Sequence, residues 1–199
     1  NPNEILYPPL CFGDTNGSIV IDITGGMGSL SYYWLNGFGN SDSLYALSDS
    51  VYSLIIIDSV ACVDTFHFVL QSPLPLDLDL ILSDSILFCG VPITIDVVIS
   101  GGIYPYSIEW SDGDTNQQKI INSGDAGNYV ILISDENNCF STDSFMIIEP
   151  DPLDISIVHS NISCTEGATA IVNVTGGIPP YTYLWSNGDT TDTIADLSS

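Results

Sequence analysis

The sequence predicts an all-β protein that is built of tandem β-sandwich modules of about 75 residues each and contains almost no helix. Three observations support this prediction. One tryptophan-containing stretch recurs at a nearly fixed interval along the 199 residues. Apolar and polar residues alternate in several short runs, and clusters of Gly, Asp, Asn and Pro separate these runs. No run places apolar residues at the 3.6-residue spacing of an amphipathic helix.

The recurring stretch occurs three times, starting at Gly25, Gly101 and Gly176. The copies read "GGMGSLSYYWLNG", "GGIYPYSIEWSDGDT" and "GGIPPYTYLWSNGDT". Their tryptophans lie 76 and 75 residues apart, at Trp34, Trp110 and Trp185. Landmarks that recur in phase indicate a repeated structural unit. We therefore interpret the stretch as scaffold and not as an isolated binding loop.

Each unit is expected to consist of short strands. Residues 76–82 and 153–159 alternate strictly, which is typical of a strand with one buried face. Other runs are rich in Val, Ile, Thr and aromatic residues and are also expected to be strands: 93–100, 106–110, 128–134, 170–177 and 181–185. The Gly-Gly pairs are expected to end strands in turns with positive φ.

These landmarks divide the chain into three expected repeats, at residues 1–73, 74–150 and 151–199. The third repeat is truncated, because it lacks the last third of the unit within this sequence. Proline-containing linkers lie at residues 71–75 and 148–152. Proline limits the bending of such linkers.

The five cysteines are spread along the chain, at Cys11, Cys62, Cys89, Cys139 and Cys164. The order Cys, Trp, Cys within a unit is typical of an immunoglobulin-like sandwich, and scattered cysteines favour disulfides in an oxidising compartment. Pairing within repeats would join Cys11 to Cys62 and Cys89 to Cys139. Pairing between repeats would join Cys62 to Cys89 and Cys139 to Cys164. We favour pairing within repeats, because small modules commonly close on themselves.

The formal net charge is −24, from 25 acidic residues against one Lys or Arg. Such a surface repels phosphate backbones, so nucleic-acid binding is excluded, and anionic lipid is disfavoured. No apolar stretch reaches the roughly 18 residues of a membrane span. One cationic side chain leaves little to stabilise an oxyanion or a phosphate, so we expect no enzyme activity.

An acidic surface can also gather cations. The candidate calcium ligands lie in acidic turns, at Asp112, Asp114, Asp135 and Glu136. The favoured alternative is that these are solvated turn residues, since none has EF-hand spacing. No other cofactor is expected, because the chain has no C-x-x-C motif and only two histidines.

The three tryptophans have two interpretations, and we favour a structural one. All three occupy the same strand phase, which is expected of core residues, whereas the alternative is a platform that stacks on carbohydrate. Asn16, Asn161 and Asn173 lie in N-x-[ST] sequons and are candidate glycosylation sites.

Several segments resemble the SprB-type repeat of large bacterial gliding and cell-surface adhesins. They are "C-x-G-x-x-x-G-S-I" at Cys11, "YVILISDENNC" at Tyr129 and the stretch at Gly176. Repeat 1 departs from the pattern because it lacks the prolines of that stretch, and repeat 2 has "GVPITI" in place of Gly-Ser-Ile. The resemblance implies a type IX secreted, extracellular surface protein of tandem immunoglobulin-like modules, without enzyme activity.

We therefore expect a structural and adhesive module array in a long surface or fibre protein, whose partners are neighbouring repeats of the same chain. One alternative is a self-assembling filament of identical chains, for which the apolar segments 54–57 and 66–70 are candidate contacts. Another is an adhesin domain that binds a surface glycan or a protein through its loops.

Overall fold

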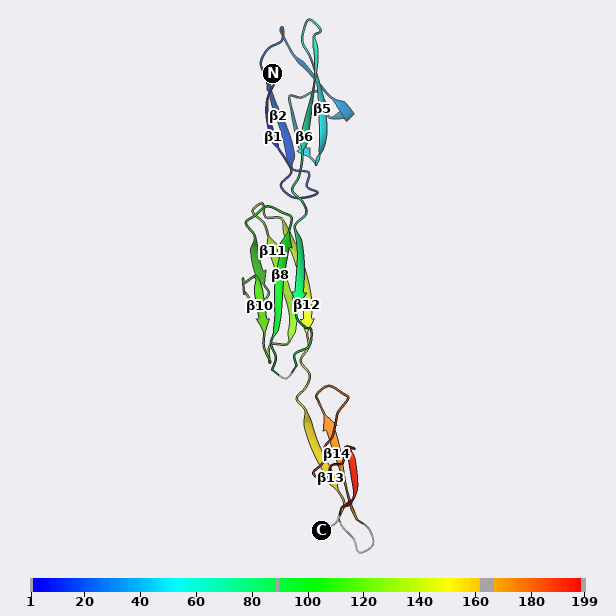
Figure 1. Ribbon diagram of the computed structural model, residues 1–199. Coiled ribbons are helices and arrows are strands. Elements are labelled where there is room, and N and C mark those ends of the chain that lie inside the picture. The colour runs from blue at the N-terminus through cyan, green and yellow to red at the C-terminus, as the bar shows by residue number, and fades with distance from the viewer. Residues whose placement is uncertain (1, 89, 162–166, 198–199) are drawn as a thin grey trace. The chain divides into compact units, whose positions relative to one another are not determined.

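The computed structural model describes residues 2–88, 90–161 and 167–197. Over these residues the chain contains fifteen strands and one 3₁₀-helix of three residues, so the predicted all-β, immunoglobulin-like class is confirmed (Figure 1). The strands form five three-stranded sheets, and each sheet draws its strands from one expected repeat. The repeat boundaries themselves stay a prediction.

The chain divides into two compact units. The first consists of Asn1–Ile81, Ile95–Lys119 and Tyr129–Phe145. The second consists of Leu82–Thr94, Ile120–Asn128 and Met146–Ser199.

Repeat 1 contains two antiparallel sheets, ordered β1-β2-β4 and β3-β5-β6. Its elements are β1 (Pro2–Tyr7), β2 (Gly17–Ile23), β3 (Ser31–Trp34), η1 (Leu35–Gly37), β4 (Ser43–Leu47), β5 (Ser50–Ile57) and β6 (Val63–Leu70).

Alternation along these strands builds one core. Its fully buried members come from β2, β4, β5 and β6, and include Ile19, Leu47, Leu54, Phe68 and Leu70. The apolar segments 54–57 and 66–70 therefore direct every second side chain into the sandwich, as ordinary core strands do. The ring of Trp34 lies 5.6 Å from that of Phe68, measured between centroids. The tryptophan thus packs on an aromatic side chain of the opposite edge strand β6 in the same sheet as β3 and β5.

Repeat 2 has two sheets, ordered β10-β8-β7 and β12-β11-β9. Its strands are β7 (Asp77–Leu82), β8 (Ile93–Ser100), β9 (Ser107–Trp110), β10 (Gln118–Ile121), β11 (Gly127–Ser134) and β12 (Phe140–Ile147). The expected strands 76–82, 93–100, 106–110 and 128–134 match β7, β8, β9 and β11. Trp110 is buried and packs on Phe145 with 6.1 Å between ring centroids, as Trp34 packs on Phe68.

Repeat 3 contains one sheet, ordered β13-β14-β15. These strands are β13 (Asp154–His159), β14 (Ala168–Thr175) and β15 (Thr193–Leu197). Residues 181–185 were also predicted to be a strand, and that prediction is wrong. Their counterpart β9 is held by a ladder to β11, in which Ile131 faces Trp110. The sequence of β11 has no counterpart in repeat 3 within the 199 residues, and among the described residues no strand pairs with the tryptophan segment.

Two of the three Gly-Gly pairs, those that begin at Gly101 and Gly176, lie against the linkers. Gly101 has φ +68°, and a Cβ atom there would lie 1.9 Å from the carbonyl oxygen of Pro75. Gly176 has φ +69°, and a Cβ atom there would lie 2.0 Å from the carbonyl oxygen of Pro152. The chain needs glycine here both for its dihedral angle and for the close approach of the linker. Shortly after each pair follows a cis proline, at Tyr104–Pro105 and Pro179–Pro180.

No helix among the described residues is long and apolar enough to cross a membrane.

Candidate functional site

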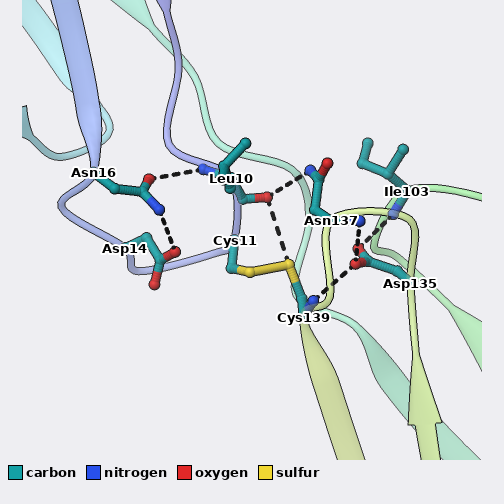
Figure 2. Close-up of a disulfide and its surroundings, with 8 residues drawn as sticks. All are labelled: Leu10, Cys11, Asp14, Asn16, Ile103, Asp135, Asn137 and Cys139. Carbon is teal, nitrogen blue, oxygen red and sulfur yellow. Dashed lines mark hydrogen bonds between the residues drawn. A yellow bond between two sulfur atoms is a disulfide. The ribbon is translucent and has the colours of Figure 1, made fainter.

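A disulfide between Cys11 and Cys139 joins repeat 1 to repeat 2 (Figure 2). The two residues are separated by 128 positions in sequence, and their Cα atoms lie 5.6 Å apart. Cys11 lies in the loop between β1 and β2, and Cys139 ends the turn between β11 and β12. We call the residues of this loop and this turn the inter-repeat junction: residues 8–16 and 135–139.

The loop that carries Cys11 is held by its own side chains. Asn16 accepts a hydrogen bond from the backbone N–H of Leu10 at 2.9 Å, and its amide nitrogen donates to Asp14 Oδ2 at 3.0 Å. The backbone N–H of Asp14 donates to the carbonyl oxygen of Cys11 at 3.2 Å. These contacts hold the backbone of the loop on both sides of Cys11.

The turn that carries Cys139 is organised by one buried carboxylate. Asp135 Oδ1 accepts the backbone N–H groups of Asn137 and Cys139, each at 2.9 Å. Asp135 Oδ2 accepts the N–H of Ile103 at 2.9 Å, which ties the turn to the loop that follows the Gly-Gly pair. A buried carboxylate with several backbone donors is strongly held. The Cys139 sulfur is therefore presented on a rigid turn.

The two halves of the junction also share a polar contact. Asn137 Nδ2 donates to the carbonyl oxygen of Leu10 at 2.8 Å, beside the disulfide (Figure 2). A shallow hollow next to the bond is lined by Phe12, Pro75, Leu76 and Phe140, among others. The junction thus combines a covalent bond, a hydrogen bond and apolar surface.

The structure corrects the predicted cysteine pairing. Cys62 is a free, exposed thiol, so the Cys11–Cys62 bond is wrong. Since Cys139 is bonded to Cys11, it is not bonded to Cys89, as pairing within repeats requires, or to Cys164, as pairing between repeats requires. Cys89 and Cys164 themselves lie outside the described residues.

Strand length explains why Cys11 and Cys62 do not meet. Cys11 precedes Gly17, the first residue of β2, whereas Cys62 lines a hollow with Ile23 and Gly25 at the other end of that strand. β2 has seven residues. At roughly 3.3 Å per residue it holds the two cysteines about 20 Å apart. Bridged Cα atoms are separated by at most about 7 Å.

The tryptophans use their polar edge inside the protein. The indole N–H of each donates to a backbone carbonyl oxygen six or seven residues ahead, at Ser41, Asn116 and Thr191. Trp34 and Trp110 are buried, and Trp185 is half-buried. Buried rings with satisfied N–H groups act as packing residues.

The candidate calcium ligands serve other partners. Lys119 Nζ lies 2.6 Å from Asp112 Oδ2 and 3.3 Å from Asp114 Oδ2, and Asp135 holds the junction turn. Glu136 is exposed in that turn. Among the described residues, no group of three or more His, Cys, Asp or Glu side chains is placed to hold a metal ion. Calcium binding stays a prediction.

Lys119 is one of the few buried charged residues, and its Nζ also lies 5.2 Å from the centre of the Trp110 ring. Burial by itself acts to lower the pKa of Lys119, but the hydrogen bonds and charges of Asp112 and Asp114 outweigh it and raise that pKa. The hydrogen bond from Lys119 in turn lowers the pKa of Asp112. The ion pair therefore ties the turn after the Trp110 strand to β10.

The sequon asparagines lie in different settings. Asn16 is exposed but hydrogen-bonded within the Cys11 loop, Asn161 follows β13, and Asn173 is exposed on β14. Glycosylation at these residues stays a prediction. His67 faces the Ser53 hydroxyl, with 2.7 Å between Nδ1 and Oγ.

Sequence reasoning missed three residues of the junction: Asp135 as its organiser, Asn137 as its polar contact, and Cys139 as the partner of Cys11. One signal was available. The spacing D-x-x-x-C occurs in phase in repeats 1 and 2, as "DSVAC" at Asp58 and "DENNC" at Asp135. A carboxylate at this spacing predicts a turn that presents the cysteine.

The fold and the junction define a class of protein: tandem immunoglobulin-like β-sandwich modules, of which the first two are joined covalently. The sequence profile of the SprB repeat matches residues 3–39, 94–115 and 156–190. These matches fall in all three expected repeats, so the resemblance to the SprB repeat is confirmed. A search of curated proteins finds no match.

Among solved structures, the chain is similar to DIP-gamma IG1+IG2, with 11% identity and a TM-score of 0.43 over 75% of this chain and 97% of that chain. It is similar to murine CEACAM1b, with 11% identity and a TM-score of 0.35 over 75% and 100% of the two chains. It is also similar to the four N-terminal Ig domains of Dscam1 isoform 9.44, with 16% identity and a TM-score of 0.32 over 51% of this chain. The chain spans 27% of that Dscam1 structure.

Proposed function

We propose that the chain is a non-catalytic structural and adhesive module array of a long bacterial cell-surface or extracellular fibre protein. The observation that carries the proposal is the Cys11–Cys139 bond, which joins one repeat to the next. The SprB repeat supports a cell-surface location. The proposal includes export by the type IX pathway.

The position of the disulfide suits a protein under tension. A force applied to the two ends of the chain passes through the disulfide. The segment between Cys11 and Cys139, whose sequence separation is 128, therefore bears no force. This segment contains all strands from β2 to β11. Fully extended, 128 residues would span about 420–460 Å, at roughly 3.3–3.6 Å per residue. The bond prevents the release of this length.

The acidic surface is consistent with such a role. A net charge of −24 keeps long chains soluble through mutual repulsion and attracts cations. The proposed partners are neighbouring repeats of the same chain, and surface glycans or proteins are candidate ligands for the loops.

Force spectroscopy on the full chain tests the mechanical part. The extension released by complete unfolding should increase by about 420–460 Å when a reductant is added. The Cys11→Ser/Cys139→Ser variant should show the longer extension with or without reductant. Equal extension of the oxidised and reduced wild-type chain would contradict the proposal. Labelling of intact bacteria with an antibody to the chain tests the location, since a signal that requires cell lysis would exclude the cell surface.

A second candidate function, a self-assembling filament subunit, is favoured by one observation. An apolar groove over β13 and β14 is lined by Leu153, Ile155, Ile157, Val172 and Val174, among others. The counterparts of Val172, Ile21 in repeat 1 and Val97 in repeat 2, are buried. The groove therefore has the composition of a sandwich interior, which suits strands donated by another chain.

Light scattering during size-exclusion chromatography tests this candidate. Self-assembly predicts oligomers of the wild-type chain and a shift to monomer for Ile155→Lys, which places a charge in the groove. A wild-type chain that stays monomeric at all concentrations would exclude it.

A further inference from the structure

The turn that ends at Cys62 has the same structure as the turn that ends at Cys139. Asp58 Oδ1 accepts the backbone N–H groups of Val60 at 3.0 Å and Cys62 at 2.9 Å. Its other oxygen, Oδ2, accepts the N–H of Met27 at 3.1 Å. These three donors are the counterparts of Asn137, Cys139 and Ile103 around Asp135.

The backbone of the two turns also agrees. Ala61 has φ 63° and Asn138 has φ 61°, although neither residue is glycine. The N–H of each donates to the carbonyl oxygen of the organising aspartate, at 3.0 Å in both turns. Such a conformation is uncommon for residues other than glycine. Its presence at the corresponding position of both repeats shows that the two turns share one backbone conformation.

In repeat 2 the turn is engaged by the repeat before it. Cys139 is bonded to Cys11, and the linker approaches the adjacent glycines, where Pro75 lies against Gly101 and Leu76 against Gly102. In repeat 1 the corresponding residues Gly25, Gly26, Asp58 and Cys62 line a hollow, and the Cys62 thiol is exposed. The positions that contact the preceding repeat in repeat 2 thus line a hollow beside an exposed thiol in repeat 1.

We propose that Cys62 is the acceptor for a disulfide from the first-cysteine loop of a preceding SprB-type repeat, which docks on the hollow lined by Gly25, Gly26 and Asp58. The donor loop has the chemistry of residues 8–16, a cysteine held by an Asn and an Asp. The inference rests on the proposed module array and extends it. The Cys11–Cys139 bond would then be one instance of a general pattern, in which the first cysteine of each repeat is bonded to the second cysteine of the following repeat.

Formation of this bond is a two-electron oxidation. The Cys62 thiol and the thiol of the donor loop lose two protons and two electrons and form one S–S bond. A disulfide oxidant, such as oxidised glutathione, accepts the electrons and protons and is cleaved to two thiols. The exposure of Cys62 allows both the oxidant and the incoming loop to reach its sulfur.

One difference between the turns predicts a weaker non-covalent contact at Cys62. Val60 stands where Asn137 donates to the carbonyl oxygen of Leu10, and its side chain has no donor. The disulfide at Cys62 therefore forms without this hydrogen bond.

The test adds a copy of residues 1–76 ahead of the full chain. Gly25 and Gly101 are 76 residues apart, so the added segment keeps the spacing between repeats. Phe12→Tyr in the added copy distinguishes its cysteine peptide by mass, and serine replaces Cys62 of the added copy and Cys89 and Cys164 of the chain. Four cysteines remain: Cys11 of each copy, Cys62 and Cys139. The protein is oxidised with glutathione, alkylated and mapped without reduction.

We expect Cys11 of the added copy to be linked to Cys62, and Cys11 of the chain to Cys139. Alkylation of Cys62 should fall at least about tenfold against the chain without the added copy, because a tethered loop has an effective concentration near millimolar. A Cys62 that stays alkylated while the Cys11–Cys139 link forms would overturn the inference and leave the proposed function intact. Absence of both links would refute the covalent junction on which the proposed function rests.

Discussion

Removal of the Cys11–Cys139 bond should destabilise repeats 1 and 2 by several kcal/mol. The perturbation is the double substitution Cys11→Ser and Cys139→Ser, which removes the bond without leaving a reactive thiol at either end. In the chain-entropy description, a disulfide that closes a loop of 128 residues reduces the entropy of the unfolded chain by an amount worth about 5 kcal/mol.

The magnitude depends little on how the repeats unfold. If repeat 2 stays folded while repeat 1 unfolds, the flexible loop runs from Cys11 to the linker near residue 76, about 65 residues. The logarithmic dependence on loop length then gives about 4 kcal/mol. Since measured effects of disulfides commonly reach about 2–4 kcal/mol, we expect a loss of about 2–5 kcal/mol in the free energy of unfolding.

Urea titration at neutral pH, followed by tryptophan fluorescence, measures this loss. Trp34 and Trp110 are buried in repeats 1 and 2 and report the unfolding of both. Cys62→Ser is the matched control: its thiol is exposed and unbonded, so the free energy should change by less than about 0.5 kcal/mol. A double variant as stable as wild type, or a loss of the same size in Cys62→Ser, would refute the reasoning.

Three further predictions concern other features. Lys119→Met removes two charge-assisted hydrogen bonds from a buried site and should cost about 1–3 kcal/mol in urea titration; an unchanged midpoint would show that the ion pair contributes nothing. Gly101→Ala forces a Cβ atom against the linker carbonyl and should lower the free energy of unfolding in urea titration more than Gly113→Ala does. The φ of Gly113 is also positive, but a Cβ atom there would meet nothing within 4 Å, so equal losses of stability would show that the close approach of the linker does not matter. The N–H of Cys62 and two further backbone donors lower the pKa of Asp58 below its ordinary value of 3.8. The stability that the Asp58 carboxylate contributes is therefore present above that pH and is lost as the pH falls through the lower, folded-state pKa. The thermal midpoint of Asp58→Asn should fall less than that of wild type below about pH 4, and an equal fall in both proteins would contradict this.

Much of the fold could be predicted from local patterns. Alternation over residues 76–82 and 153–159 predicted β7 and β13, because a strand with one buried face leaves a period of two in the sequence. Residues 181–185 end in a tryptophan, as β9 does, and are rich in aromatic residues, yet they form no strand. Strand formation there depends on a ladder partner far along the chain, which local composition does not reveal.

The candidate site could be predicted only in part. The spacing of cysteines gave a correct expectation that disulfides occur, but not their partners. Pairing depends on which ends of the sandwiches face each other, and Cys11 and Cys62 lie at opposite ends of β2. The calcium hypothesis was based on the acidic composition of the turns. In the structure Asp112 pairs with Lys119, and Asp135 accepts backbone N–H groups. Such partners cannot be identified from the sequence.

The most direct test of the account is to map the disulfides of the purified, oxidised full chain without reduction. Free thiols are first alkylated, and the proteolytic peptides are then identified by mass spectrometry. The account predicts a peptide that contains Cys11 linked to one that contains Cys139, together with an alkylated Cys62. A link from Cys11 to Cys62, or from Cys139 to Cys89, would contradict it.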